Sequence, residues 1–260
     1  MTSNPPGRGR AVAPSPPAAR RAADAYHHGA LRQALLDAAQ SILEEQGLEG
    51  FTLRECARRA GVSHAAPAHH FGDAAGLLTA FATLGFERLA ELMRQHRGRA
   101  AGTGEAQLRA VGLAYVDFAI RHRAHFQLMF RHDRLDASDP DLAAAGARAS
   151  GHLAETLQAA LAARGVDCED SEFDDRMMLA WSGVHGFATL LLEGRLDGWR
   201  GRQSPGRFAL AAGDRLLALL ETALLRPDGA AAMPAQPGGG PSRAGLHESQ
   251  PAGTRARRRP

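Results

Sequence analysis

Apolar side chains recur every three or four residues along most of the chain, which is the spacing of one face of an α-helix. No segment between residues 25 and 226 shows the regular alternation of apolar and polar residues that predicts a half-buried strand. The apolar stripes run from Leu31 to Ile42, Leu77 to Leu92, Leu108 to Phe118, Met177 to Leu191 and Leu216 to Leu224. This pattern predicts an all-α protein with about nine helices.

Three short motifs indicate where helices begin. Asp139-Pro140 and Ser204-Pro205 each place a capping residue before a proline at the first helical position. The stretch from Ser171 to Asp174 is typical of a capping box, in which two side chains satisfy backbone N–H groups reciprocally. We expect a helix to start at each of these places.

The composition is that of an ordinary globular protein, with 44% hydrophobic and 23% charged residues in a chain of 260. Two cysteines, Cys56 and Cys168, are too few for a disulfide framework, which predicts a cytoplasmic protein. The first 24 residues lack the apolar run of a signal peptide. The longest apolar stretch, residues 177–192, is interrupted by Ser, Gly and His, so no membrane span is expected.

The two ends of the chain differ from its middle. Eleven of the fourteen prolines lie in residues 1–24 or 227–260. Such segments bury too little surface to offset the entropy lost on ordering. We therefore predict a disordered basic, Pro-rich arm at 1–24 and a disordered basic, Ala/Gly/Pro-rich tail at 227–260. The 202 residues between them carry a net charge of −3, so the overall charge of +3 is weak evidence for a DNA-binding face.

Residues 51–71, FTLRECARRAGVSHAAPAHHF, combine several signals in a short space. Thr52 and Glu55 predict a capping box before a helix over residues 53–60. Gly61 is placed to end that helix in the left-handed conformation, and Ser63 to cap a second helix that runs to about residue 70. Small Ala57 allows the two helices to cross closely. These features predict a helix-turn-helix, whose second helix enters the major groove of DNA.

The stretch from Tyr26 to Met93 resembles the DNA-binding domain of the TetR/AcrR-like (tetracycline-repressor) family of bacterial transcriptional regulators. The resemblance is carried by LRQALLDAAQSILEEQGLEGFTLREC, then ARRAGVS, then a recognition helix ending in HF and a leucine pair that starts a long helix. It implies a helix-turn-helix domain at 25–73, a connecting long helix at 74–98 and a ligand-binding and dimerisation domain at 99–226. The chain departs from the family pattern at Ala68 and Ala74, where Tyr and Lys often contact phosphates.

Pro67 is expected at about the fourth position of the second helix, where it removes a backbone donor. The residues predicted to contact double-stranded DNA are Thr52, Arg54, Ser63, His64, Ala65, Ala66 and His69. Arg58 and Arg59 share the helix of Arg54. The methyl groups of Ala65 and Ala66 suit thymine, although simple close packing in the groove explains them equally well.

Residues 25–98 carry seven arginines and eight acidic residues, so this part of the chain supplies no net positive charge. Arg20 and Arg21 are placed to enter a minor groove as an arm. If the histidines supply the missing charge, DNA binding should weaken from about pH 6 to about pH 8, since unperturbed histidine titrates near ~6.5.

The C-terminal part, 99–226, resembles a subgroup of the same family with a Trp-His-Gly signature, here Trp181, His185 and Gly186. The resemblance implies a ligand pocket among the helices and a homodimer formed by the last two helices. A two-fold dimer would present two recognition helices to a pseudo-palindromic operator. Candidate pocket residues for an unknown small-molecule effector are Tyr115, Phe118, His122, Phe126, Met129, Phe130, Trp181 and His185, with Met177 beside them. Plain core packing remains the alternative for each of them.

Other chemistry has little support in the sequence. The histidine pairs have no Cys or carboxylate at zinc spacing, so no metal site is predicted. Cys56 is expected to be a small buried residue. No GxSxG, Walker, GxGxxG or HExxH motif occurs, which predicts no enzyme and no cofactor.

The sequence thus predicts a transcriptional regulator, a ligand-responsive repressor that binds a pseudo-palindromic operator as a homodimer. Two alternatives stay open. One is a helical small-molecule-binding module with weakened or lost specific DNA binding, and the other is a purely structural helical dimer.

Overall fold

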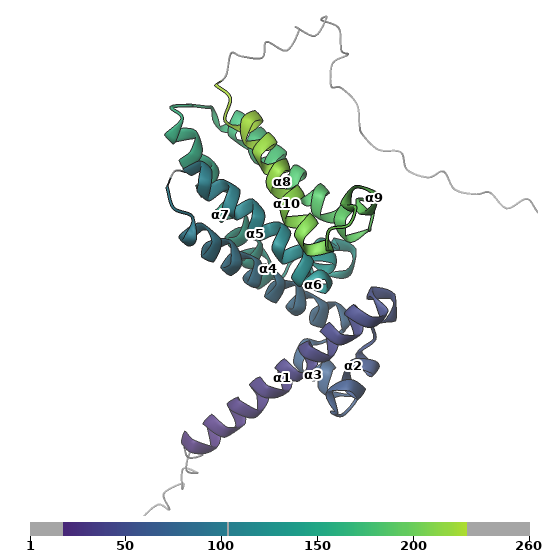
Figure 1. The fold of residues 1–260 in the computed structure, drawn as a ribbon. Coiled ribbons are helices and arrows are strands. Elements are labelled where there is room, and N and C mark those ends of the chain that lie inside the picture. The colour runs from purple at the N-terminus through teal and green to yellow at the C-terminus, as the bar shows by residue number, and fades with distance from the viewer. Residues whose placement is uncertain (1–17, 103, 228–260) are drawn as a thin grey trace, which may run out of the picture. The chain divides into compact units, whose positions relative to one another are not determined.

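The computed structural model describes residues 18–102 and 104–227, and for residues 18–28 only the backbone. This part of the chain is all-helical and has no strand, as predicted, with ten α-helices in place of about nine (Figure 1). The α-helices are α1 (Ala18–Gln46), α2 (Leu53–Ala60), α3 (Ala66–Phe71), α4 (Ala74–Arg99), α5 (Gly104–Arg121), α6 (Arg123–Met129), α7 (Pro140–Ala163), α8 (Asp170–Leu192), α9 (Asp197–Arg200) and α10 (Pro205–Leu224). Two 3₁₀ helices, η1 (Leu48–Gly50) and η2 (His132–Arg134), complete the set.

Helix α1 begins at Ala18, inside the segment that was expected to be disordered. For residues 18–24 that expectation is wrong, because the run AARRAAD consists mostly of strong helix formers and continues directly into the apolar stripe of α1. Arg20 and Arg21 therefore belong to a helix and not to an extended arm. The rest of the predicted arm, 1–17, and the tail 228–260 with its basic cluster 255–259 lie outside the described residues.

The predicted helix starts are confirmed at α7 and α10 and wrong at α8. Helix α7 begins at Pro140, and the Asp139 carboxylate accepts a hydrogen bond from the Leu142 amide at 2.8 Å. Helix α10 begins at Pro205, after Ser204. In α8 the capping box is formed by Glu169 and Glu172, two residues before the expected one. A longer carboxylate side chain replaces the usual serine as the cap.

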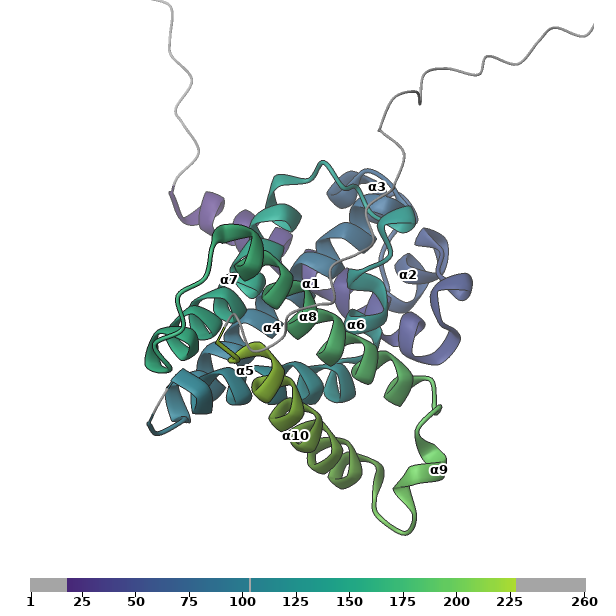
Figure 2. The same ribbon diagram turned by 90° about the horizontal axis from the view of Figure 1, so that it is seen from above.

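Helix α4 joins two regions, the head (residues 29–73) and the body (residues 104–227). It packs against α3 in the head and against α5, α6 and α7 in the body. One continuous apolar core follows it, from Leu35 and Ile42 in α1 through Phe81 and Leu89 in α4 to Phe118 in α5. Burial of apolar surface contributes ~25 cal/mol per Å², so this shared core is the main force that holds head and body together. Helices α8 and α10 contact each other along one edge of the body (Figures 1 and 2).

Helices α4 and α6 approach each other closely at Gly85. A Cβ atom at Gly85 would lie 2.8 Å from Met129 Sδ and 3.0 Å from His125 Cδ2, so a larger residue there would force these side chains to shift. The His125 ring stacks on Phe81 with centroids 3.8 Å apart. The short helix α6 is thereby fixed to the middle of α4.

Candidate DNA-binding surface and ligand cavities

The first helix of the motif is built as the sequence predicts at its start and end. Thr52 caps α2, and its Oγ1 accepts from the Glu55 amide at 3.2 Å, which leaves the hydroxyl hydrogen free for another acceptor. Gly61 ends the helix with φ 67° and ψ 31°, and Ala57 is fully buried at the crossing. The reciprocal half of the predicted capping box is absent, because the Glu55 carboxylate binds two arginines.

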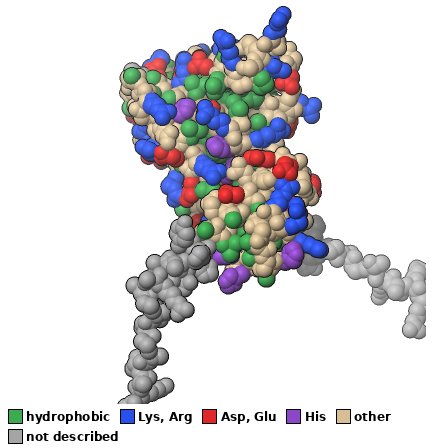
Figure 3. All heavy atoms as spheres, turned by 60° about the horizontal axis from the view of Figure 1, so that its bottom comes forward, with side chains coloured by type: hydrophobic (Ala, Val, Ile, Leu, Met, Phe, Trp, Pro, Cys, Tyr) green, Lys and Arg blue, Asp and Glu red, His purple; other side chains and the backbone are tan. Residues whose placement is uncertain are grey.

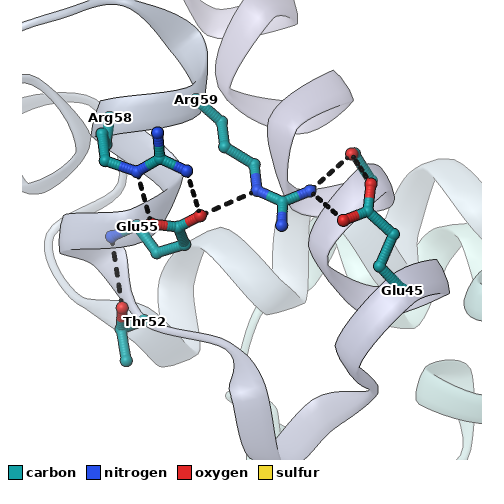
Figure 4. Close-up of polar contacts among 6 residues, drawn as sticks. Glu45, Thr52, Glu55, Arg58 and Arg59 are labelled. Atoms are coloured by element: carbon teal, nitrogen blue, oxygen red, sulfur yellow. Dashed lines mark hydrogen bonds and ion pairs between the residues drawn. The ribbon is translucent and has the colours of Figure 1, made fainter.

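Those arginines form an ion-pair cluster at the surface of the head (Figure 4). Arg58 makes a two-pronged contact with Glu55, both N···O distances being 2.7 Å. Arg59 bridges Glu55 at 2.9 Å and Glu45 of α1 at 2.8 Å. These bonds lower the pKa of the Glu55 carboxyl to about 2. Arg58 and Arg59 are thus paired internally, whereas Arg54 is exposed and forms no ion pair with another described residue.

Helix α3 starts two residues later than predicted. It begins at Ala66, and Ser63 is not its cap, since Ser63 lies in the preceding turn and its carbonyl accepts from the Ala66 amide at 3.0 Å. The reason is Pro67. In this register the proline falls in the first turn, where a missing N–H removes no helical hydrogen bond. The expected conflict at its fourth position does not arise.

The outer side of α3 and its preceding turn is open to solvent. Ser63, His64, Ala65, Ala68 and His69 are exposed, and Ala66 is half-buried. In Figure 3 histidine side chains lie at the free end of the head, with arginine side chains beside them.

Helix α3 is held in place from the α1 side. The Arg32 guanidinium lies 5.3 Å from the centre of the Phe71 ring. A short helix with few bonds of its own is thus anchored against the longest helix of the head.

The body contains a cavity of about 330 Å³, here called the bundle cavity, which is open to solvent beside the exposed side chains of Met178 and Trp181. Its walls come from α4, α5, α7 and α8. The lining residues are Leu89, Met93, Val111, Gly112, Tyr115, Ala149, Ser150, Leu153, Met177, Met178, Trp181 and Val184. A volume in this range suits a small organic molecule.

A second cavity, of about 490 Å³, lies where the head meets the body and is here called the junction cavity. The end of α1 and η1 form one side, and α6 and α8 form the other. Phe126, Phe130 and His185 give it an aromatic wall, whereas Glu49, Arg131 and Glu193 bring charges to its lining.

Tyr115 and His185 stand between the two cavities. Tyr115 lines the bundle cavity and His185 the junction cavity, and the Tyr115 hydroxyl lies 2.7 Å from His185 Nδ1. Burial raises the pKa of Tyr115 and lowers that of His185, so both are neutral near pH 7.

The predicted pocket residues therefore divide into three groups. Tyr115 and Trp181 line the bundle cavity, together with Met177, and Phe126, Phe130 and His185 line the junction cavity. Three candidates line neither. Phe118 and Met129 are fully buried in the core. His122 is not on the α5 stripe, because the helix ends at Arg121 and His122 adopts φ −124° and ψ 47° before α6.

Several cavity residues were missed by sequence reasoning. They include Leu89 and Met93 of α4 and Ala149 and Leu153 of α7. Apolar periodicity shows which helix face points inward, but it does not show where the packed side chains leave a space.

Cys56 is buried, as expected, and its Sγ donates a hydrogen bond to the Leu35 carbonyl at 3.2 Å. Burial raises the pKa of its thiol to about 11, so it is a poor nucleophile. Within residues 18–102 and 104–227, no group of three or more His, Cys, Asp or Glu is placed to hold a metal ion. None of the described helices is both long and apolar enough to span a bilayer.

Comparison with known proteins agrees with this arrangement. Residues 35–81 match the family model for bacterial regulatory proteins of the tetR family, and residues 108–212 match the tetracyclin repressor-like C-terminal domain. A structure of a protein of unknown function from Rhodococcus sp. RHA1 is 35% identical, with a TM-score of 0.62. That match covers 75% of this chain and 98% of the Rhodococcus chain. The chain belongs to the tetR family of regulatory proteins.

Curated relatives of this tetR-family chain are HTH-type transcriptional regulators named BetI. The one from Burkholderia thailandensis is 38% identical over 86 residues. The match covers 33% of this chain and 44% of BetI, so it spans less than half of that relative's length. The tetR-family regulator PfmR from Thermus thermophilus is 18% identical, with a TM-score of 0.53, and the match covers 75% of this chain and 95% of PfmR. At that identity the likeness shows the fold alone.

The two family matches fall on the two regions of the structure, the regulatory-protein match on residues 35–81 from the head into α4 and the repressor-like C-terminal match on residues 108–212 of the body. The narrower Trp-His-Gly subgroup stays a prediction.

Proposed function

We propose that this protein is a ligand-responsive repressor that binds a pseudo-palindromic operator as a homodimer, with a small-molecule effector in the bundle cavity. One observation carries the proposal. Helix α4 starts beside α3 and then supplies Leu89 and Met93 to the wall of the bundle cavity. An effector with different affinity for two positions of α4 would therefore change the position of the recognition helices.

On the DNA side, the proposed contacts follow from exposure and charge. Thr52 donates its free hydroxyl hydrogen to a phosphate, and Arg54 adds the one α2 guanidinium that is unpaired among the described residues. His64, Ala65 and His69 are exposed and are proposed to face the major groove of DNA. Exposed Ser63 and half-buried Ala66 lie next to them in the sequence. In this arrangement Arg54 contributes position and affinity, and His64 contributes sequence preference.

The homodimer is supported by an apolar surface on α8, α9 and α10. Leu219 is 72% and Trp199 78% exposed, and Leu179, Leu190 and Leu210 are also exposed. A groove of about 580 Å³ between α8, α9 and α10 includes Phe187 and Leu216. Contiguous exposed apolar surface of this kind is typical of a protein interface. A second copy that repeats the same helices would cover it with two-fold symmetry.

A specific observation also favours a second candidate, a ligand-binding module with weak or lost specific DNA binding. Ala68 and Ala74 lack the side chains that contact phosphates in many relatives, and Arg58 and Arg59 are held by Glu55 and Glu45. Arg54 is then the principal cation left on this face of α2.

The experiment that separates the two is a fluorescence-anisotropy titration of the full chain against duplex DNA from upstream of its own gene. A scrambled duplex serves as the control, and both titrations are repeated at two salt concentrations. Preference for the upstream duplex that persists at the higher salt supports the repressor. Weak binding that is blind to sequence and lost at the higher salt supports the ligand-binding module.

A further inference from the structure

None of the described residues that line the bundle cavity carries a charge. None of its twelve lining residues is Asp, Glu, Arg or His. Two methionines on α8, Met177 and Met178, and Met93 on α4 give it flexible, polarizable walls. The junction cavity nearby is different, since Glu49, Arg131 and Glu193 are among its lining residues.

An uncharged lining selects against charged ligands. An ion that enters such a cavity loses its water and gains no counter-charge, and this desolvation cost is large in an apolar site. A neutral apolar molecule gains the full benefit of leaving water. The cavity therefore discriminates between ligands by charge before it discriminates by shape.

Few groups are available for hydrogen bonding with a ligand. The Ser150 hydroxyl is engaged with the Ala147 carbonyl at 3.1 Å. The Tyr115 hydroxyl faces neutral His185 and is also hydrogen-bonded to the Trp181 side chain. Because a phenol can form three hydrogen bonds, capacity for one bond to a ligand remains. Tyr115 is 4% exposed, so a hydrogen bond formed there is shielded from water.

We propose that the effector is a neutral, predominantly apolar molecule that carries one hydrogen-bonding group, placed at the Tyr115–His185 pair. This inference rests on the proposed function, because it names the class of ligand for the same cavity. An anionic or cationic effector of the same size should bind there more weakly, because no residue of the described lining supplies a counter-charge.

The test uses two dyes with the same rings. N-phenyl-1-naphthylamine is neutral with one N–H group, and 8-anilino-1-naphthalenesulfonate adds a sulfonate. Both brighten in apolar surroundings, and each is titrated into the full chain without DNA. We expect saturable binding of one neutral dye per subunit and at least about tenfold weaker binding of the sulfonate in the same cavity.

Variants assign the binding to the cavity. Ala149→Phe fills it from α7, and Ala147→Phe makes the same change on an exposed position of that helix. Ser150→Trp obstructs it from an exposed position, so it tests the same point if Ala149→Phe does not fold. With Trp199→Phe, Trp181 is the only tryptophan, so energy transfer from it reports dye binding to the body, and the filling variants assign that binding to the bundle cavity.

Loss of the neutral dye in Ala149→Phe or Ser150→Trp, with binding kept in Ala147→Phe, supports the inference. Equal or tighter binding of the sulfonate in the cavity overturns it. An affinity for the neutral dye that is unchanged in both Ala149→Phe and Ser150→Trp also overturns it. Because no DNA is present, this result is independent of operator binding. Failure of the dye test with intact operator recognition rejects the ligand class and leaves the repressor proposal standing.

Discussion

The head and the body prepare for binding in opposite ways. In the head, Arg58 and Arg59 form ion pairs with Glu55, and Arg54, which forms none with a described residue, is the α2 arginine proposed to contact DNA. In the body, apolar side chains fill most of the interior, and the unfilled space forms the bundle cavity. In the head, the group available for binding is a charge without an internal partner. In the body, it is a space that the packed side chains do not fill.

The largest effect is expected at the apolar surface of the body. Leu219→Glu places a charge where a second copy is proposed to pack, so the dimer should dissociate. Operator affinity should fall by at least ~100-fold, since a monomer presents one recognition helix instead of two. Analytical ultracentrifugation and anisotropy measure both changes. Ala144→Glu, at an exposed position of α7, is the matched control. If the Leu219→Glu protein is still a dimer, the interface lies elsewhere.

The second effect concerns a buried histidine of the body. His125 is 1% exposed, and its Nε2 lies 3.1 Å from Arg88 Nη1. A guanidinium only donates, so Nε2 accepts and the ring hydrogen is on Nδ1, which has no hydrogen-bond partner among the described residues. Burial lowers the pKa of His125 to about 3, so the unfolded chain binds a proton between about pH 6.5 and pH 3 and the folded chain does not.

Stability should therefore fall as pH drops below about 6.5, with a contribution from His125 of about 1.4 kcal/mol per pH unit. His125→Gln keeps an acceptor for Arg88 and cannot titrate, so its free energy of unfolding should depend less on pH by that slope. Urea unfolding at pH 7, 6 and 5 measures it. His132→Gln changes an exposed histidine and serves as the control. Identical slopes in wild type and His125→Gln would contradict the assignment.

A smaller effect separates free from paired arginines in the head. Arg54→Ala should weaken binding to all DNA sequences alike, by roughly tenfold at low salt, and lower the salt slope by about 1. Arg58→Ala, on the same helix, should change affinity less because its guanidinium is held by Glu55. Anisotropy at three salt concentrations compares the two variants. A larger loss in Arg58→Ala would mean that DNA breaks the ion pair.

The smallest effect is the acid sensitivity of that ion pair. The pKa of Glu55 is about 2 in the folded chain against 4.5 for a free side chain. The pair therefore stabilises the head fully above about pH 4.5 and loses this contribution as pH falls toward 2. The difference in Tm between wild type and Glu55→Gln should shrink over that range. Glu44→Gln, at an exposed position of α1 outside this ion pair, is the control and should show no such convergence.

The ends of the helices could be predicted from the sequence better than the residues that line the cavities. Caps and turns are local, so Thr52, Gly61 and the Asp139-Pro140 pair could be placed from a few neighbouring residues. Pro67 shows where such local prediction fails. Helix α3 begins late enough for the proline to lie in its first turn and not further along the helix.

The cavity could be predicted only in part. Tyr115 and Trp181 were among the candidates and line it, whereas Phe118 lies on the same α5 stripe as Tyr115 and is packed in the core. The apolar periodicity of α5 predicts that both Tyr115 and Phe118 point inward, and it does not distinguish a cavity wall from the packed core. The difference depends on which facing side chains are small, such as Ala149 on α7, and that pairing is set by how helices distant in sequence cross.

The length of α4 gives it mechanical leverage. From Leu89 at the cavity wall to the first residue, Ala74, the helix spans about 22 Å at ~1.5 Å per residue. A tilt of only about 5° about the cavity end would move the other end by about 2 Å. Two copies tilting in opposite senses would change the separation of their recognition helices by up to about twice that amount. A tilt of a few degrees at the cavity would thus be enough to change how the proposed recognition helices fit successive major grooves.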